Sequence, residues 1–410
     1  DAMITNHNIS LSGGTDSVTY YLSASHLDQE GIIASDKSNF VRDNVKLSLG
    51  IDVTEKLKTT LNLNYFANER KTINESGLGS VLFNAISYSP IYALDQEDIL
   101  TPGTANIPNG WAGFGNEIIN PFSQIRDTYN SYFGSSIEGN FQLEYEVIDG
   151  LTATSRIGFK TYSDKAKSFS PIVNYGAGKV FNTDRSTVSQ NKQQYNSYTW
   201  DSFINYKKSF LQDHTAEVTL GMAVRKDWGD GLFATGYDVP NNSWEFADIA
   251  LTTGTNEGKE NGSYTYDNRL LSYFARLQYD FKGKYLLSGM LRRDASSAFD
   301  KDYRVDYFKS VTAGWKISEE SFLESVSFID FLKLRASYGT LGNLVGNDLY
   351  RATLSGEATY VFDNILTNGT ALGPLPNPVA SWETAEKLDF GLDAKLFDNS
   401  LEIVADYFIE

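Results

Sequence analysis

Apolar and polar residues alternate along most of this chain, and the alternation is clearest in the segment LLSYFARLQYDFKGKYLLSGMLRRDASSAF, which ends at Phe299. The first half of this segment places leucine, alanine and aromatic side chains at every second position, with Ser272, Arg276 and Gln278 between them. Because successive side chains of a β-strand point to opposite faces, the pattern predicts a strand with one apolar and one polar face. A second strand follows the turn at Lys282. Aromatic residues near strand ends are typical of a transmembrane β-barrel.

The same alternation recurs in many other segments and predicts about thirteen spanning strands in all. Besides the hairpin above, these strands are expected at residues 18–27, 44–53, 57–65, 137–147, 151–159, 198–206, 214–224, 311–317, 332–338, 388–396 and 401–407. The earlier segment from Asn8 to Gly13 is too short to span a bilayer, so we interpret it as an inner tether.

Connections between the predicted strands alternate in length. Short turns, such as Asp149-Gly150, are followed by long loops at residues 71–127, 163–191, 226–262 and 341–381. Outer-membrane barrels have short periplasmic turns and long extracellular loops, so we predict an all-β fold, a transmembrane antiparallel β-barrel. Complete bacterial single-chain barrels have an even number of strands and no open edge in lipid, so we expect more strands outside this chain.

Composition and charge exclude several other classes of protein. The chain has no run of eighteen apolar residues, which argues against a transmembrane helix. A net charge of −17 argues against nucleic acid as a partner, since a phosphate backbone is bound by clustered Lys and Arg. With no cysteine, the chain has neither a disulfide framework nor thiolate metal sites.

Enzyme signatures are absent from the sequence. His7, His26 and His214 do not occur at the spacing of metal ligands. The chain has no G-x-S-x-G elbow and no phosphate-binding glycine loop. We therefore expect no catalytic residue, no cofactor and no bound metal, and predict that the protein is not an enzyme.

Candidate binding residues lie in the predicted loops and on the polar strand faces. Trp111, Trp228 and Trp244 fall in long loops, where an indole ring either contacts substrate or a partner or only packs the loop. The run Asp227–Gly231, DWGDG, is read either as a calcium- or sugar-binding loop or as an ordinary turn-rich loop. Charged residues on the polar face either solvate a wet lumen or contact substrate; they are Glu138, Glu144, Arg156, Lys160, Glu217, Arg225 and Asp393.

Several motifs in order resemble the barrel signatures of the SusC/RagA family of TonB-dependent outer-membrane transporters of Bacteroidetes. Besides the opening hairpin, they are NHNISLSGG, YYLSASHLDQEGII, SVTAGWKISEESF, LKLRASYGTLGN and NPVASWETAEKLDFGLDAKLFDNSLEIVADYF, which together run from Asn6 to Phe408. The resemblance assigns residues 1–16 to a plug-to-barrel connection or inner tether strand. It assigns residues 17–410 to the N-terminal and central part of the barrel, without the plug and the C-terminal strands.

The resemblance also implies a function. Such transporters form barrels of 22 strands closed by a plug, of which this chain supplies about 13. They import oligosaccharides or oligopeptides across the outer membrane, beneath a SusD-like surface lipoprotein that acts as a lid, with energy delivered through TonB, ExbB and ExbD. Family members often form a dimer of transporter–lipoprotein pairs. The expected partners are therefore the lipoprotein, the TonB complex, outer-membrane lipid and an oligosaccharide or peptide substrate.

Two alternatives remain open at this point. An extracellular soluble all-β binding protein would bury the apolar strand faces between two sheets. An energy-independent porin would use the same barrel without TonB. The sequence does not distinguish a glycan from a peptide substrate, and it leaves open the oligomeric state, the plug features and the loop residues that touch cargo or lid.

Overall fold

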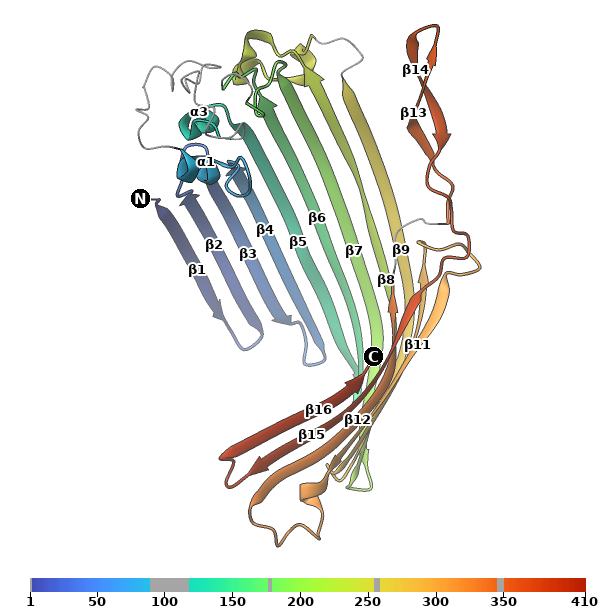
Figure 1. The fold of residues 1–410 in the computed structure, drawn as a ribbon. Coiled ribbons are helices and arrows are strands. Elements are labelled where there is room, and N and C mark those ends of the chain that lie inside the picture. The colour runs from blue at the N-terminus through green and yellow to red at the C-terminus, as the bar shows by residue number, and fades with distance from the viewer. Residues whose placement is uncertain (1, 89–117, 176–178, 254–258, 345–349) are drawn as a thin grey trace.

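Fourteen strands follow one another in a single antiparallel sheet, in the order of the sequence (Figure 1). The computed structural model describes residues 2–88, 118–175, 179–253, 259–344 and 350–410. The strands of the sheet are β1 (Ile4–Gly14), β2 (Val18–Glu30), β3 (Asn39–Asp52), β4 (Leu57–Lys71), β5 (Tyr129–Ile148), β6 (Leu151–Ser170), β7 (Thr187–Phe210), β8 (His214–Tyr237), β9 (Glu260–Phe281), β10 (Tyr285–Ser296), β11 (Val305–Lys316), β12 (Ile329–Asn343), β15 (Glu383–Leu396) and β16 (Leu401–Ile409).

The remaining elements lie in the connections. A separate hairpin of β13 (Leu354–Phe362) and β14 (Ile365–Leu372) lies between β12 and β15. Short helices are α1 (Val81–Ser87) and α3 (Pro121–Arg126), and the 3-10 helices are η1 (Pro240–Asn242), η2 (Trp244–Phe246), η3 (Ile249–Leu251) and η5 (Ile317–Glu319). No helix in the described ranges is both long and apolar enough to cross a membrane.

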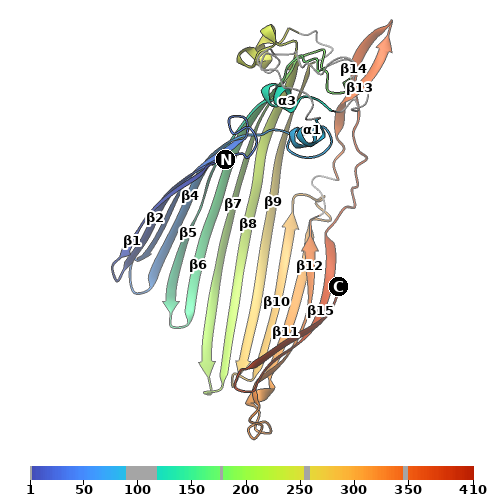
Figure 2. The ribbon, with the colours of Figure 1, turned by 60° about the vertical axis from the view of Figure 1, so that its left-hand side comes forward.

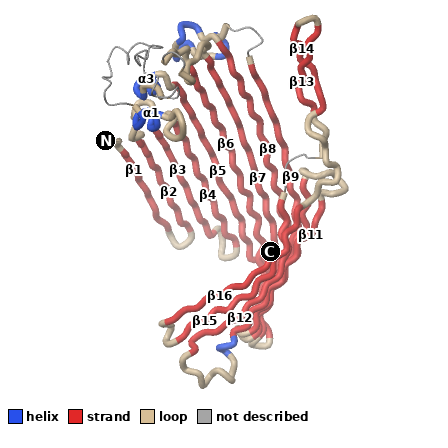
Figure 3. Tube along the Cα trace, viewed as in Figure 1, coloured by secondary structure: helices blue, strands red, loops and turns tan. Residues whose placement is uncertain are grey.

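The sheet is a curved, twisted wall whose two ends differ. The connections at one end are mostly tight turns, whereas α1, α3 and the β13–β14 hairpin lie at the other end (Figures 1 and 2). We call these the turn end and the loop end. Drawn by secondary structure, nearly the whole wall is strand (Figure 3). The predicted alternation of short and long connections is thus confirmed.

The cross-strand register keeps apolar residues on one face of the sheet and polar residues on the other. Phe141 pairs with Ile157, and Ile157 pairs in turn with Trp200. These three side chains are 40%, 44% and 43% exposed, so no second layer covers them. The two-sheet alternative is therefore wrong: the second sheet among the described residues is the two-stranded β13–β14 ribbon, which is too small to cover this face.

The predicted strands are present, but several are longer than predicted. The thirteen expected strands correspond to β2–β12, β15 and β16, and Ile4–Gly14 adds a fourteenth strand paired with β2 along its whole length. Strands β6 and β8 extend well into the segments predicted as loops at 163–191 and 226–262, and β7 and β9 begin a few residues before those segments end. Both faces of these extensions are largely polar, so the apolar alternation that marks a strand disappears there.

Candidate functional site on the polar face and at the loop end

All seven charged residues predicted on the polar face share that face in the structure. Most are paired with an opposite charge. Glu138 lies 3.6 Å from Lys160, Arg156 lies 2.8 Å from Asp201, and Arg225 lies 2.7 Å from Asp227. Glu217 accepts a hydrogen bond of 2.8 Å from the Asn205 amide. The face is therefore hydrophilic and locally close to neutral.

Arg335 joins the last three strands of the sheet on this face. Its guanidinium lies 3.0 Å from Asp393 and 2.8 Å from Asp406, and 3.8 Å from Asp389. Gly391 lies between Arg335 on β12 and Asp406 on β16 in the register. A Cβ atom at Gly391 would lie 2.4 Å from the guanidinium carbon, so glycine gives the arginine room to cross β15.

A row of aromatic side chains crosses the polar face nearer the loop end. Phe66, Tyr162, Tyr195 and Tyr266 occupy one register row on β4, β6, β7 and β9. Their ring centroids are separated by 6.4 Å, 6.0 Å and 6.3 Å in that order. Ser136 and Gly229, two small residues, fill the row on β5 and β8. These distances are within the range of aromatic pairs.

Three rings on β8 and β9 lie directly on facing glycines. A Cβ atom added to Gly229 would lie 2.8 Å from the Tyr266 ring, and one added to Gly231 would lie 2.4 Å from the Tyr264 ring. At Gly262, a Cβ atom would lie 2.3 Å from the ring of Phe233. The glycines therefore allow these rings to lie against the neighbouring backbone.

The aromatic row was not predicted from the sequence. An open groove of about 360 Å³ lies further towards the loop end, lined by residues that include Tyr132, Asn191 and Phe233. Another groove, of about 390 Å³, adjoins the row on the turn side and is lined by residues that include Asn64, Glu138 and Lys160. The signal in the sequence was the tyrosines at 162, 195, 264 and 266, which stand within otherwise polar stretches.

The predicted tryptophans do not form one site. Trp111 lies outside the described residues. Trp228 is not in a loop, because β8 continues to Tyr237; its ring belongs to the face opposite Tyr195, where it contacts Tyr198 edge-on with centroids 6.0 Å apart. Trp244 does lie in a loop, within η2, where it stacks on Tyr129 at 5.9 Å and receives the Lys167 ammonium at 4.3 Å from the ring centre.

The run DWGDG is likewise part of a strand and not the loop that we expected. Glycine and aspartate are common in turns, but Gly229 and Gly231 here face the rings of β9. The described residues contain no group of three or more His, Asp or Glu side chains suited to a metal ion. Of the histidines, His26 contacts Asp43 at 2.7 Å and His214 contacts the Tyr279 hydroxyl at 2.6 Å.

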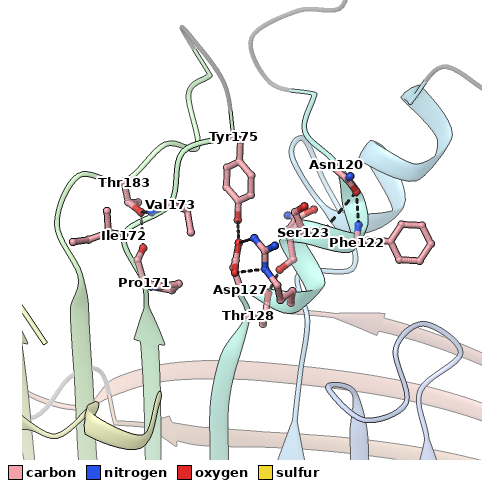
Figure 4. A network of polar contacts seen from close by, with 12 residues as sticks. Asn120, Phe122, Ser123, Asp127, Thr128, Pro171, Ile172, Val173, Tyr175 and Thr183 are labelled. Carbon is pink, nitrogen blue, oxygen red and sulfur yellow. Dashed lines mark hydrogen bonds and ion pairs between the residues drawn. The ribbon is translucent and has the colours of Figure 1, made fainter. Parts of the chain in front are cut away.

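A buried polar network ties two connections together at the loop end (Figure 4). Arg126 donates two hydrogen bonds, of 2.8 Å and 2.7 Å, to the Asp127 carboxylate, and the Tyr175 hydroxyl donates to the same group at 3.3 Å. The hydrogen bond to Asp127 raises the pKa of Arg126, and burial raises the pKa of Tyr175. Both groups therefore keep their protons, and the β4–β5 connection stays joined to the β6–β7 connection.

Apolar contacts reinforce this loop end. Ile119, Val173 and Tyr175 form a buried cluster against Phe181. A second cluster contains Phe169, Val188, Val239 and Ala247 with Trp244 packed against it. Asn120 caps α3 by accepting from the backbone N–H of Phe122 at 2.9 Å. The described part of the loop end is therefore a folded surface above the sheet.

Comparison with known proteins agrees with this geometry. The family profile described as "TonB dependent receptor-like, beta-barrel" matches residues 93–409. This chain belongs to the TonB-dependent receptor β-barrel family. The apolar face is accordingly the lipid-facing side of an outer-membrane barrel and the polar face is its interior.

Named relatives share this membership. TonB-dependent receptor P3 of Formosa agariphila is 28% identical over 99% of this chain and 39% of its own length. TonB-dependent receptor SusC of Bacteroides thetaiotaomicron is 26% identical over 96% of this chain and 39% of its own length. The chain thus spans less than half of these receptors. The predicted resemblance to SusC-like receptors is confirmed.

A solved structure of the RagAB peptide transporter shows the same fold. It superposes with a TM-score of 0.79 at 22% sequence identity, over 99% of this chain and 44% of that chain. The two relatives are named as TonB-dependent receptors, and neither name describes an enzyme.

Proposed function

We propose that the whole protein imports a nutrient across the outer membrane, as a SusC-type transporter. The observation that carries the proposal is the sheet itself, which exposes apolar side chains on one face and lines the other with paired charges, hydroxyls and amides. Family membership and the names of the relatives support it. In the complete barrel the polar face would line the route of the solute.

We further propose that transport is energised through TonB, ExbB and ExbD. An energy-independent porin would have the same barrel wall, so the two functions must be separated by experiment. Growth on the transported nutrient should be lost when the gene for this protein is deleted, and also when tonB alone is deleted. Growth that persists without TonB would contradict energised import and favour the porin.

A SusD-like lipoprotein is the proposed partner at the loop end. The folded cap formed by the β4–β5, β6–β7 and β8–β9 connections supplies a surface for such a lid. Trp244 lies in this cap, and Trp111 belongs to one of the same connections. We also propose a dimer of transporter–lipoprotein pairs, which the mass of the detergent-solubilised complex would test.

The lid proposal is tested by replacing the loop tryptophan. Trp244→Ala should leave barrel assembly intact but reduce recovery of the lipoprotein with the transporter, because the partly buried indole that shapes this part of the cap is removed. Trp315→Ala is the matched control, since Trp315 lies on β11 at the turn end. Equal recovery of the lipoprotein with both variants would remove Trp244 from the lid interface.

A further inference from the structure

The polar face carries a set of flat aromatic surfaces at the row already described. Tyr264, Tyr266 and Phe233 each lie against a glycine of the neighbouring strand, where no side chain separates the ring from the backbone. Tyr264 is 41% exposed and Phe233 is 49% exposed. We call Tyr195, Tyr264, Tyr266 and Phe233 the aromatic platform.

Hydrogen-bonding groups border the platform at the ring edges. The Tyr195 and Tyr264 hydroxyls lie 3.1 Å apart, and both contact the side-chain carbonyl oxygen of Gln193, Tyr264 at 3.2 Å. Each hydroxyl both donates and accepts, and Gln193 supplies an amide. Ring faces flanked by hydroxyls and an amide suit a ligand with an apolar face and a hydroxylated edge.

Charge near the platform disfavours an anionic ligand. The register row beside the aromatic row, on its turn-end side, contains Glu138, Lys160 and Asp227. Glu138 is paired with Lys160, and Asp227 is paired with Arg225 of the same strand. Asp164 lies in the row of Gln193 and Tyr264; it is buried, with 9% exposed, and it makes no ion pair within the described residues. A bound carboxylate or sulfate would be repelled by this uncompensated negative charge, whereas a neutral ligand would not.

We propose that the aromatic platform binds pyranose rings of a neutral oligosaccharide. A pyranose ring presents C–H groups on one face, which interact favourably with the negative face of an aromatic ring. Its hydroxyls match the Gln193 amide and the tyrosine hydroxyls. This assignment rests on the proposed import function and names the substrate class for it.

A structural role for the same rings predicts a different result. Aromatic residues cover glycines in sheets simply to protect the strand pairing, and loss of a ring would then weaken the barrel without changing ligand affinity. Binding and barrel stability must therefore be measured on the same variants.

The test uses the full-length protein purified in detergent. Binding is measured by calorimetry for neutral hexasaccharides of glucose, xylose and mannose, for hexagalacturonate and for an alanine-rich hexapeptide. At least one neutral sugar should bind. The double variant Tyr264→Ala/Phe233→Ala should bind that sugar about tenfold or more weakly, since two stacking surfaces are lost. Tyr264→Phe should retain most of the affinity because the ring remains.

The chain offers a matched control on the same strand. Tyr273 of β9 is 48% exposed but belongs to the opposite, lipid-facing side, so Tyr273→Ala should leave sugar affinity unchanged. Heat-modifiable migration of every variant checks that the barrel is intact. Asp164→Asn should improve binding of hexagalacturonate relative to the neutral sugar, because it removes the unpaired carboxylate.

Two results would overturn the platform. One is unchanged sugar affinity in the double variant; the other is binding of the peptide or hexagalacturonate with no binding of any neutral sugar. Neither result bears on import, which the tonB deletion tests. Conversely, sugar binding that depends on the platform, without TonB-dependent growth, would contradict energised import and leave the platform in place.

Discussion

Strand β9 carries tyrosine on both of its faces, and the two settings differ. Tyr264 lies on Gly231, with its hydroxyl in a polar cluster, whereas Tyr273 lies on the apolar face with the Arg293 guanidinium 5.9 Å from its ring centre. Their exposed fractions, 41% and 48%, are nearly equal. Exposure and residue type therefore do not assign a role to an aromatic residue in this sheet. The role of an aromatic residue depends instead on the face of the sheet on which it lies.

The largest effect should come from a charge on the lipid-facing side. Leu277 is 49% exposed on that face, and Leu277→Arg should destabilise the barrel by about 2–4 kcal/mol, because an ion is transferred into hydrocarbon. The neighbouring Gln278→Arg should cost less than about 0.5 kcal/mol, since it adds a charge to the wet face opposite Glu217. Folding yield in the membrane, read by heat-modifiable migration, compares the two. Equal yields would contradict the assignment of the faces.

A smaller effect is expected within the polar face. Arg335→Leu leaves Asp389, Asp393 and Asp406 without their shared cation, and we expect a small loss of barrel stability, limited because Arg335 is partly exposed. Salt should reduce this loss by screening the repulsion between the carboxylates. Arg156→Leu breaks a single pair and is the control. A loss no larger than that of the control, or one that salt does not change, would show that the three-acid cluster is not coupled.

The smallest effect should be a pH dependence at the turn end of the lipid-facing side. Glu320 accepts hydrogen bonds from the Tyr285 hydroxyl at 2.7 Å and from the Trp315 indole at 3.0 Å. These bonds hold the pKa of Glu320 below its ordinary value of 4.5. A depressed pKa means that the stabilisation is present above about pH 4.5 and is lost as the pH falls through the lowered pKa of the folded protein.

The measurement is the thermal transition of the barrel between neutral pH and pH 3, compared with Glu320→Gln. The variant should lack the part of the acid sensitivity that comes from this residue. Identical pH profiles for the two proteins would show that Glu320 does not contribute.

The strands were predictable because their central parts alternate between apolar and polar residues, as in the hairpin that ends at Phe299. Their loop-side ends were not, because segments such as Lys192-Gln193-Gln194 are polar on both faces and lack that period. The glycines at 229 and 231 were assigned to a loop because glycine favours turns. Their actual contacts are with rings on the adjacent strand, a long-range relation that local patterns do not contain.

The candidate site shows the same limit. Charged residues on the polar face were correctly grouped, since alternation alone places them together. The aromatic row was missed, because Phe66, Tyr162 and Tyr266 come into one row only through the successive pairing of all the strands from β4 to β9. Trp228 was placed in a loop, yet it belongs to β8 and to the face away from that row.

Neighbouring residues of these strands face lipid and water in turn, and this alternation can be measured directly. The chain has no cysteine, so single cysteines can be introduced into it by Leu277→Cys and Gln278→Cys and labelled in intact membranes with a charged maleimide. We expect fast labelling at position 278 and little or none at position 277. Equal labelling at both positions, or faster labelling at 277, would contradict it.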